Sequence, residues 1–284
     1  MPLPTPATAS GRAGLAAIRN DPRRAMLAYD YDGVLAPIVD NPSHAFPQPG
    51  AVAALGRLAH LVGSVVVISG RPADVVVKLG GFADAPDLRG LVVFGHYGRE
   101  RWDATTGEIL APPTPAGIDA LRHELPDVIR AYAPPQAWLE DKGVALAVHT
   151  RTCPDPAAAL AALRSPIADC AERHGLVVEP GRYVLEIRPP GVDKGHALRE
   201  YALERHAAAV AYTGDDLGDL SAFAAVEGLR AIGVPGLKVG SGSAEVLEVA
   251  QRADLVVDGP PGVVAFIEGL IEALTHAGDS IDRG

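Results

Sequence analysis

Short apolar runs alternate with helical stretches over the first third of the chain. Residues 25–29, 65–68 and 91–94 are continuous apolar runs, which is typical of strands that are buried on both faces. Residues 50–62 and 73–79 lie between these runs, and the spacing of their apolar positions predicts a helix in each. Strands that alternate with helices predict a Rossmann-like α/β core, in which helices cover both faces of a parallel sheet.

The same alternation returns near the end of the chain, where we expect helices at 194–206 and 261–275 and short strands at 210–213, 229–233 and 255–257. Prolines interrupt the pattern in the middle, where two helices and two strands are predicted at 116–133, 145–149, 156–174 and 183–187. This segment predicts a smaller α+β unit inserted into the core. The predicted organisation is a flexible tail at 1–12, a core at 13–112 and 190–284, and the inserted unit at 113–189.

The charge of the chain limits its partners. A formal net charge of −10 repels nucleic acid and anionic membranes, so we expect neither as a partner. An anionic substrate therefore needs a local positive site. Lysine is scarce, and the chain has only Lys78, Lys142, Lys194 and Lys238.

Cysteine content and hydropathy indicate the compartment. Cys153 and Cys170 are too few for a disulfide framework, which predicts free thiols in a reducing compartment. The first residues do not have the pattern of a signal peptide, and no apolar run is long enough to span a bilayer. We expect a cytoplasmic monomer.

The first chemical motif, Asp30-Tyr31-Asp32-Gly33, follows a predicted strand. Two aspartates spaced by two on extended backbone point the same way, and a hard cation such as Mg²⁺ offsets their repulsion. Asp30 could then attack phosphorus while Asp32 protonates the leaving oxygen. The same residues also suit an Asp-Gly turn that leaves a strand.

The next two motifs could hold a phosphoryl group. Ser69, Gly70 and Arg71 follow the second strand, where a hydroxyl and backbone amides at a helix N-terminus form an anion site. Ser69 could instead be an ordinary helix cap. Lys194 opens a predicted helix, where the dipole disfavours a cation, and a bound phosphate would rationalise it. The alternative is a surface lysine.

The fourth motif, Gly214-Asp215-Asp216-Leu217-Gly218-Asp219, follows an apolar strand. We expect one of its aspartates to bind the metal and the others to support it. An acidic loop that caps the next helix is the alternative. The predicted metal residues are Asp30, Asp32, Asp215, Asp216 and Asp219, and the predicted catalytic residues are Asp30, Asp32, Ser69 and Lys194.

The order of these four motifs resembles the haloacid dehalogenase-like superfamily of phosphotransferases over residues 25–275. The inserted unit lies where that superfamily carries one type of cap domain. The resemblance implies a magnesium-dependent reaction through an aspartyl phosphate. The superfamily usually has Thr after Asp-x-Asp-Gly, whereas this chain has Val34, from which we expect tuning and not inactivity.

Longer segments resemble the trehalose-6-phosphate phosphatase family in particular. They are Asp30 to Val39, Ile68 to Pro72, Gly95-His96-Tyr97-Gly98-Arg99-Glu100, Leu139 to Gly143, and Leu185 to Pro189 leading to Lys194-Gly195. The resemblance implies hydrolysis of trehalose 6-phosphate, with Glu140, Lys142 and Glu186 on a cap face that looks into the site. Arg182 is a further candidate for substrate binding.

Several alternatives stay open. The family form Gly-x-His-Gly is replaced by Gly95-His96-Tyr97-Gly98, which leaves the roles of His96 and Tyr97 undecided. Residues 140–142 could be a solvated turn, and His149 and Arg151 are expected to be structural or surface residues and not catalytic ones. The glycine pattern between Lys238 and Ser243 is too short for a nucleotide site, and we expect a loop there, near the metal side of the core. Other functions to separate are a phosphatase for another sugar phosphate such as sucrose phosphate, a non-catalytic sensor, and a phosphotransferase or mutase.

Overall fold

The computed structural model describes residues 3–281 apart from residue 89 and residues 243–246. The chain divides into two compact units. One unit contains the residues up to Ala111 together with those from Asp193 onward, and the other contains Pro112–Val192. These limits differ by one residue at the first predicted boundary and by three at the second.

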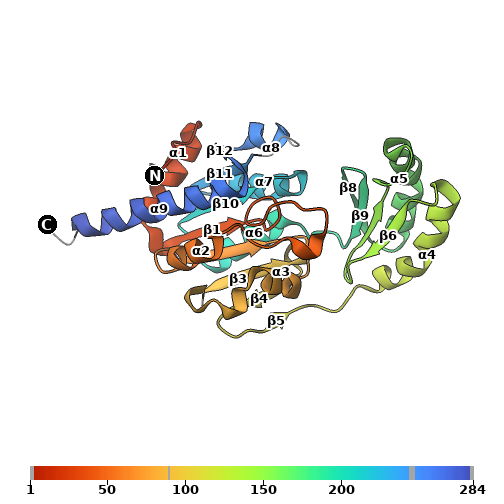
Figure 1. Ribbon diagram of the computed structural model, residues 1–284, viewed down its shortest axis with the longest axis horizontal. Coiled ribbons are helices and arrows are strands. Elements are labelled where there is room, and N and C mark those ends of the chain that lie inside the picture. The colour runs from red at the N-terminus through yellow and green to blue at the C-terminus, as the bar shows by residue number, and fades with distance from the viewer. Residues whose placement is uncertain (1–2, 89, 243–246, 282–284) are drawn as a thin grey trace. The chain divides into compact units, whose positions relative to one another are not determined.

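The first unit, which we call the core, is built on an eight-stranded sheet within the described residues, in the order β12-β11-β10-β1-β2-β3-β4-β5 (Figure 1). The six strands from β12 to β3 run parallel, and β4 and β5 continue the sheet as antiparallel strands. The strands are β1 (Ala25–Tyr29), β2 (Ser64–Ile68), β3 (Leu91–Gly95), β4 (Glu100–Asp103), β5 (Ile109–Leu110), β10 (Ala209–Gly214), β11 (Gly236–Ser241) and β12 (Leu255–Val257).

Helices cover both faces of this sheet, which confirms the predicted α/β class. One apolar cluster joins the sheet to α1 (Ala9–Asn20), α2 (Ala51–Ala59), α3 (Ala73–Gly80) and α9 (Gly259–Ile281). The cluster on the opposite face joins it to α6 (Lys194–Glu204), α7 (Leu220–Ala231) and α8 (Leu247–Arg252). None of the helices in the described part of the chain is long and apolar enough to span a bilayer.

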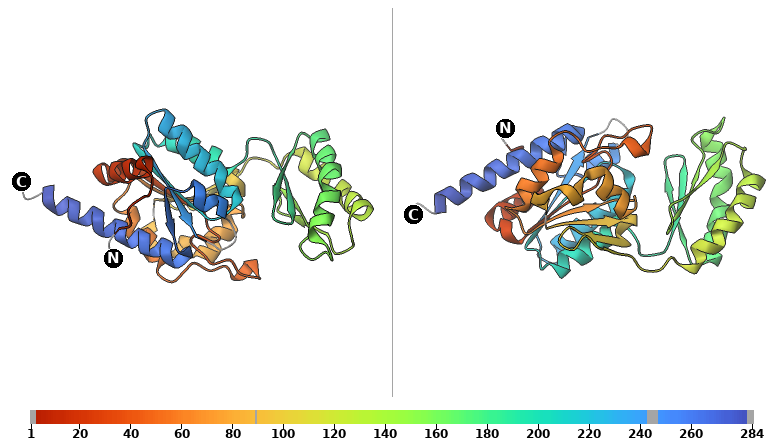
Figure 2. Two further views of the ribbon diagram at one scale, coloured as in Figure 1. Left: turned by 90° about the horizontal axis from the view of Figure 1, so that it is seen from above. Right: turned by 60° about the horizontal axis from the view of Figure 1, so that its bottom comes forward.

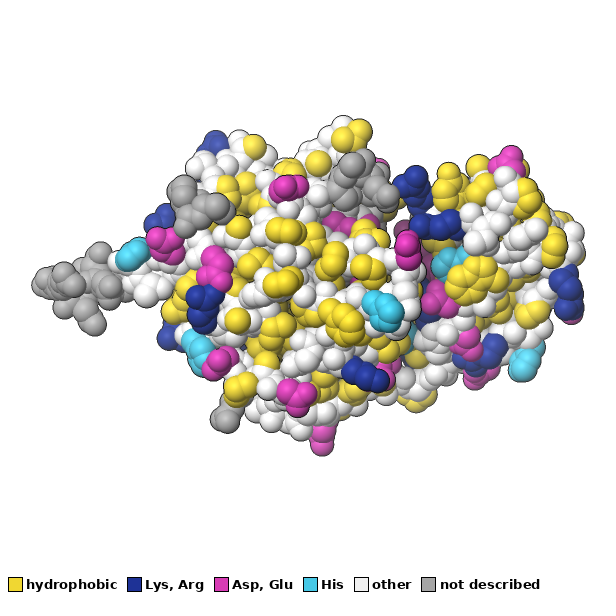
Figure 3. All heavy atoms as spheres, viewed as in Figure 1, with side chains coloured by type: hydrophobic (Ala, Val, Ile, Leu, Met, Phe, Trp, Pro, Cys, Tyr) yellow, Lys and Arg dark blue, Asp and Glu magenta, His cyan; other side chains and the backbone are white. Residues whose placement is uncertain are grey.

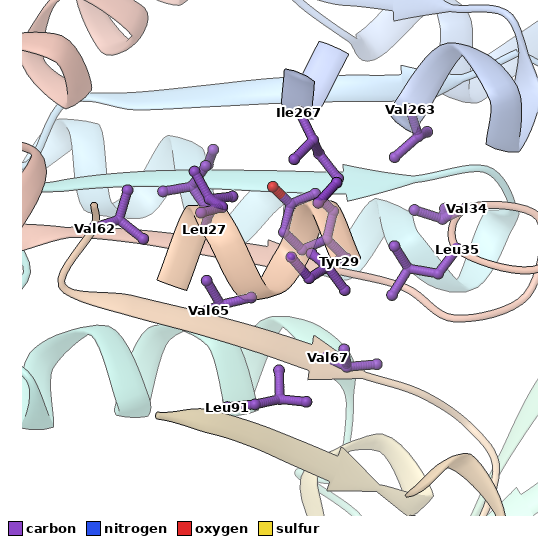
Figure 4. Packing of buried hydrophobic residues seen from close by; sticks show 14 of the residues in the cluster. Leu27, Tyr29, Val34, Leu35, Val62, Val65, Val67, Leu91, Val263 and Ile267 are labelled. Carbon is purple, nitrogen blue, oxygen red and sulfur yellow. The ribbon is translucent and has the colours of Figure 1, made fainter. Parts of the chain in front are cut away.

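Strand β1 lies in the middle of the sheet, and its sequence is apolar throughout because both of its faces are buried. Its side chains alternate between the faces, so that Leu27 and Tyr29 enter one cluster while Met26 and Ala28 enter the other. Figure 4 shows Leu27 and Tyr29 packed among residues of β2 and α9. The buried strand leaves its first polar residue, Asp30, at its carboxyl end.

The prediction of a flexible tail at residues 1–12 is wrong for the part of it that the structure describes. Helix α1 begins at Ala9, and the side chain of Thr8 accepts a hydrogen bond from Gly11 N at 2.9 Å. The Thr8 hydroxyl also donates to Asp254 Oδ1 at 2.5 Å, and Ala7 N donates to Asp254 O at 2.7 Å. The Thr8 cap and the buried carboxylate of Asp254 therefore fix a segment whose composition is typical of a flexible tail.

The predicted strand at 229–233 is also wrong, because α7 extends to Ala231 and the strand follows at Gly236–Ser241. Leu229 is fully buried as part of the apolar face of that helix. A short apolar run cannot distinguish the end of a buried helix from a strand. The segment Lys238 to Ser243 was expected to be a loop, but its residues up to Ser241 belong to β11, and residue 243 lies outside the described residues.

The second unit, which we call the inserted unit, has an antiparallel four-stranded sheet in the order β6-β7-β9-β8. Its strands are β6 (Trp138–Asp141), β7 (Leu146–His149), β8 (Val177–Gly181) and β9 (Val184–Arg188), and its helices are α4 (Ala116–Tyr132) and α5 (Pro156–Arg173). Both helices lie on one side of the sheet, and a single apolar cluster fills the space between them and the sheet (Figure 2). The predicted α+β character of this unit is confirmed.

Candidate active site

Three neighbouring parallel strands of the core end in polar residues. Asp30 directly follows β1, Ser69 follows β2 and Asp215 follows β10. The strand order β10-β1-β2 places these carboxyl ends side by side. In open α/β sheets ligands bind at this edge, so the strand order alone brings residues from distant parts of the chain into one site.

A buried lysine joins the acidic residues of the site. Lys194, the first residue of α6, places its Nζ 2.8 Å from Asp30 Oδ2 and 2.7 Å from Asp219 Oδ1. Burial disfavours the ammonium, but Asp219 and Asp30 outweigh burial and raise the pKa of Lys194 well above its usual value. Its 3% exposure rules out the alternative of a surface lysine.

Asp219 is fully buried and has both carboxylate oxygens occupied by the protein. Oδ1 accepts hydrogen bonds from Lys194 Nζ and from the Tyr212 hydroxyl, each at 2.7 Å. Oδ2 accepts hydrogen bonds from the backbone amides of Asp215 at 2.7 Å and Asp216 at 3.1 Å. Four donors leave this carboxylate with little capacity for a metal, so its geometry is that of a residue that positions Lys194 and the loop 215–216.

Asp30 is held by one donor on each oxygen. Oδ1 accepts from the backbone amide of Tyr31 at 2.7 Å, and Oδ2 faces Lys194 Nζ. Burial raises the pKa of Asp30 well above its usual value, Lys194 lowers it, and the neighbouring aspartates raise it further. The site thus concentrates negative charge around a carboxylate whose orientation is fixed.

Gly33 permits the close approach of two motifs. It has a φ of +69°, and a Cβ at this position would lie 2.0 Å from Asp215 Oδ2. Its carbonyl oxygen accepts a hydrogen bond from the buried Ser241 hydroxyl at 2.6 Å. Glycine therefore follows Asp32 for a steric reason as well as for the turn. The next residue, Val34, is fully buried in the apolar cluster, a surrounding that suits valine in place of threonine.

The donor set fits a hard divalent cation. Carboxylate oxygens of Asp30, Asp215 and Asp219 lie within 4.8 Å of one another, and all three residues are buried. Lys194 supplies a single positive charge among them, so the ionised cluster is negative overall. Burial and the nearby Asp219 raise the pKa of Asp215 to about 8, which shows how strongly this site disfavours uncompensated charge. Because Asp219 is saturated, Asp30 and Asp215 are the better ligands.

The other two predicted metal residues lie outside this group. Asp216 is exposed, and its side chain takes part in a capping box with Asp219 at the start of the turn 217–219. Asp32 forms a two-pronged ion pair with Arg71, from Nε to Oδ2 at 2.6 Å and from a terminal nitrogen to Oδ1 at 2.8 Å. The remaining terminal nitrogen of Arg71 donates to Pro42 O at 2.8 Å. Arg71, expected to bind substrate, is here committed to the protein.

Ser69 is not the cap of helix α3. The first amide of that helix, Ala73 N, donates to Glu100 Oε2 at 2.7 Å, and the Ser69 hydroxyl accepts from Arg71 N at 3.2 Å. Within the described residues, no contact is found in which the Ser69 hydroxyl donates its hydrogen. The side chain is 1% exposed, and its free donor is available to an anionic oxygen.

The segment His96-Tyr97 holds the loop that carries Ser69. His96 N donates to Arg71 O and Tyr97 N donates to Ser69 O, both at 2.9 Å. These two residues have φ values of +47° and +60°, respectively. A Cβ on Gly70 would come within 2.7 Å of the Tyr97 ring, so this ring covers Gly70, while His96 Nε2 lies 3.6 Å from Glu100.

Tyr212, Ser241 and Glu100 were not found by sequence reasoning. The sequence predicts Tyr212 only as a residue of a buried strand, although a buried phenol needs a polar partner. Ser241 lies in a segment that was expected to be a loop. Glu100 belongs to a segment that resembles the family, but no local pattern indicates that it accepts a hydrogen bond from the first amide of α3.

In the inserted unit, the predicted substrate residues form two pairs. Lys142 Nζ lies 3.0 Å from Glu186 Oε1, and Glu140 Oε2 lies 2.8 Å from Nε2 of His149. Residues 140 and 186 alternate with residues of the apolar cluster, so they belong to the sheet face opposite the helices.

Arg182 lies apart from these pairs, in the turn between β8 and β9. It lines a cavity of about 590 Å³ whose other lining residues come from that turn and from α5, and which none of Glu140, Lys142 and Glu186 lines. Its guanidinium lies 5.8 Å from the ring centre of Tyr183.

The comparisons with known proteins agree on one family. A profile described as trehalose-phosphatase matches residues 28–260. A trehalose-phosphate phosphatase from Mycobacterium marinum is 32% identical over 269 residues, which are 90% of this chain and 64% of the relative. A trehalose-6-phosphate phosphatase from Escherichia coli K12 is 30% identical over 249 residues, which are 87% of this chain and 86% of the relative.

Solved structures show the same fold. The C-terminal domain of the trehalose-6-phosphate phosphatase from Candida albicans superimposes with a TM-score of 0.75 at 22% identity, covering 95% of this chain and 99% of that domain. A likeness at this level of identity shows the fold alone. The chain spans just under two thirds of the length of the Mycobacterium marinum relative.

Proposed function

Because the chain belongs to the trehalose-phosphatase family, we propose that it hydrolyses trehalose 6-phosphate to trehalose and phosphate. The observation that carries this proposal is the buried group of Asp30, Lys194 and Asp219 at the carboxyl end of β1. It combines an oriented nucleophile with a fixed positive charge, the two requirements for transfer of a phosphoryl group to a carboxylate.

The proposed reaction has two steps. A carboxylate oxygen of Asp30 attacks phosphorus, the bond between phosphorus and the sugar oxygen breaks, and Asp32 gives that oxygen a proton. Asp32 then takes a proton from water, the water oxygen attacks phosphorus, and the bond to Asp30 breaks to release phosphate. The ammonium of Lys194 and the hydroxyl of Ser69 stabilise the charge on the phosphoryl oxygens.

The same proposal includes Mg²⁺ as the resident metal, held by Asp30 and Asp215. When bound, it would offset charge on the carboxylates and on the phosphoryl group. Asp219 supports the metal ligands without being one of them. It fixes Lys194 and, through two backbone amides, the loop that carries Asp215.

Asp32 needs a change of contacts before it acts as the acid. Both of its oxygens accept hydrogen bonds from Arg71, and an oxygen that accepts from a guanidinium is not placed to give a proton to substrate. We therefore assign Arg71 the role of positioning Asp32, with the fork loosening when substrate binds. Gly70, under the ring of Tyr97, gives the loop of Ser69 a close-packed support.

The sugar would be recognised by the inserted unit. Glu140, Lys142 and Glu186 carry the carboxylates and the ammonium that suit vicinal hydroxyl groups. Their pairing within the unit keeps the charges compensated, and hydroxyls can replace the contact between Lys142 and Glu186 while Glu140 keeps its contact with His149.

The decisive experiment is a panel of sugar phosphates measured with and without magnesium. The proposal predicts that trehalose 6-phosphate has the highest kcat/KM and that a chelator removes the activity. Faster turnover of another sugar phosphate, such as sucrose phosphate, would overturn the proposed substrate but not the proposed two-step phosphoryl transfer. Binding without any phosphate release would indicate a sensor, and transfer of phosphate to an added alcohol would indicate a phosphotransferase.

A further inference from the structure

The exposed side of the sheet in the inserted unit carries an aromatic pair that the proposed reaction does not use. The indole of Trp138 stacks on the imidazole of His149, with ring centres 4.2 Å apart and planes inclined by 12°. The two residues face each other across β6 and β7 in the antiparallel register. Trp138 is nevertheless 47% exposed, so this stacking leaves much of the indole accessible.

Other contacts fix the position of this pair. Nε2 of His149 lies 2.8 Å from Oε2 of Glu140, so the carboxylate orients the imidazole on which the indole rests. Glu140 follows Trp138 by two positions on the same strand and projects from the same face of the sheet. An aromatic ring held in this way loses little further freedom when it binds a ligand.

The aromatic pair does not serve the apolar core of the unit. That core lies on the opposite face of the sheet, between the strands and the helices α4 and α5, and neither Trp138 nor His149 belongs to it. A half-exposed tryptophan beside charged side chains is the composition of a binding surface. Figure 3 shows hydrophobic, acidic, basic and histidine side chains close together on the surface of this unit.

The chemistry of the face selects the ligand. A hexopyranose ring has an apolar side made of C–H groups and a rim of hydroxyls. The indole offers a flat apolar surface to the C–H groups. The carboxylates of Glu140 and Glu186 offer acceptors to the hydroxyls, and Lys142 offers a donor. A phosphate ester without a sugar ring would have no use for the indole.

We propose that Trp138, supported by His149, is a stacking platform for a pyranose ring of the substrate and a determinant of sugar specificity. This inference rests on the proposed function, because it assumes that the substrate is a sugar phosphate. It adds an apolar contact to the polar groups of the inserted unit, and it gives His149 the role of positioning the indole.

The kinetic test compares Trp138→Ala and Trp138→Phe with the wild type on trehalose 6-phosphate and on acetyl phosphate, which lacks a ring. We expect Trp138→Ala to raise KM for the sugar phosphate about tenfold, with kcat within about threefold and with acetyl phosphate turnover unchanged. Trp138→Phe should keep most of the affinity, and His149→Ala should fall between the two. Tyr132→Ala, which truncates a 55% exposed aromatic residue at the end of α4, is the matched control.

The change in tryptophan emission on addition of a ligand gives a second readout, which does not depend on turnover. The chain has two tryptophans, and Trp102 is buried in the core at 4% exposure. Addition of trehalose should therefore change the emission of the wild type, and the change should disappear in Trp138→Phe. The platform alone would be overturned by two results together, in a wild type that hydrolyses trehalose 6-phosphate. These results are an unchanged KM in Trp138→Ala and an unchanged emission of the wild type on addition of trehalose. A wild type that does not hydrolyse this substrate would overturn the proposed function.

Discussion

The acidic site of the core and the polar face of the inserted unit use similar residues in different ways. Lys194 has 4% side-chain exposure and contacts carboxylates with 6% and 0% exposure. Lys142 has 22% side-chain exposure and contacts a carboxylate with 13% exposure. Buried charges must be fixed and compensated, whereas partly exposed charges can exchange a protein partner for a ligand.

This difference assigns catalysis to the core and substrate recognition to the inserted unit. In the core, each oxygen of Asp219 accepts two hydrogen bonds, so the geometry around Lys194 is set before any substrate arrives. In the inserted unit, the contacts of Lys142 with Glu186 and of Glu140 with His149 join partly exposed side chains. Substitutions in the core should therefore change kcat and stability, and substitutions in the inserted unit should change KM.

The largest expected effect is that of Asp30→Asn. The amide cannot form the aspartyl phosphate, so kcat should fall by at least about 10⁴-fold. The melting temperature should stay equal to that of the wild type or rise, because the change removes a buried charge whose pKa is raised mainly by burial. The matched control is Asp40→Asn, at an exposed residue in the loop that follows the Asp30 motif. This variant should keep full activity.

The second prediction compares Lys194→Ala with Lys142→Ala. Removal of Lys194 leaves buried carboxylates without their cation and should cost about 3–5 kcal/mol of unfolding free energy, together with about 10³-fold in kcat. Removal of the partly exposed Lys142 should cost less than about 1 kcal/mol of unfolding free energy and should act on KM. Denaturant unfolding and steady-state kinetics measure both. Equal losses of stability in the two variants would contradict the distinction between the regions.

Much of the core site could be predicted because its signals are local. Asp30, Ser69 and Asp215 each follow a buried strand, and the edge of a parallel sheet brings such positions together. The position of Lys194 at a helix start was also visible in the sequence.

The rest depends on contacts that no local pattern encodes. Asp219 was expected to support the metal, but its contact with Lys194 joins residues 25 positions apart, and this contact makes it a residue that positions the lysine. The fork between Arg71 and Asp32 joins residues 39 positions apart. The composition of residues 1–12, which is rich in proline, threonine, alanine and serine, predicts a flexible tail, whereas the contact between Thr8 and Asp254 joins residues 246 positions apart.

The third prediction concerns the fork itself. Arg71→Ala should lower kcat for trehalose 6-phosphate about 10²-fold because Asp32 loses its orientation. The loss should be much smaller for p-nitrophenyl phosphate, whose leaving group needs little protonation, and Arg71→Lys should recover only part of it because lysine lacks the fork. A rise in KM with unchanged kcat for both substrates would instead restore Arg71 to the substrate-binding role.

The last prediction concerns stability and not activity: without the metal, the free energy of unfolding should depend on pH. Asp215 has a pKa of about 8 in the folded protein and an ordinary value of 3.8, so between these values the folded state binds the additional proton. Stability from this group should then fall as pH rises from about 4 to about 8. Magnesium must displace that proton, so it should raise the melting temperature more at about pH 8 than at about pH 5. Thermal scans with chelator or magnesium test this, and Asp215→Asn should flatten the difference.

The central claim is that Asp30 carries the phosphoryl group during hydrolysis of trehalose 6-phosphate. The most direct measurement is rapid acid quenching of the enzyme during turnover, followed by digestion and mass spectrometry of the peptide that contains Asp30. The account predicts the added mass of one phosphoryl group on Asp30, absent without substrate and absent in Asp30→Asn. A phosphoryl group on another residue, or phosphate release by Asp30→Asn at the rate of the wild type, would contradict it.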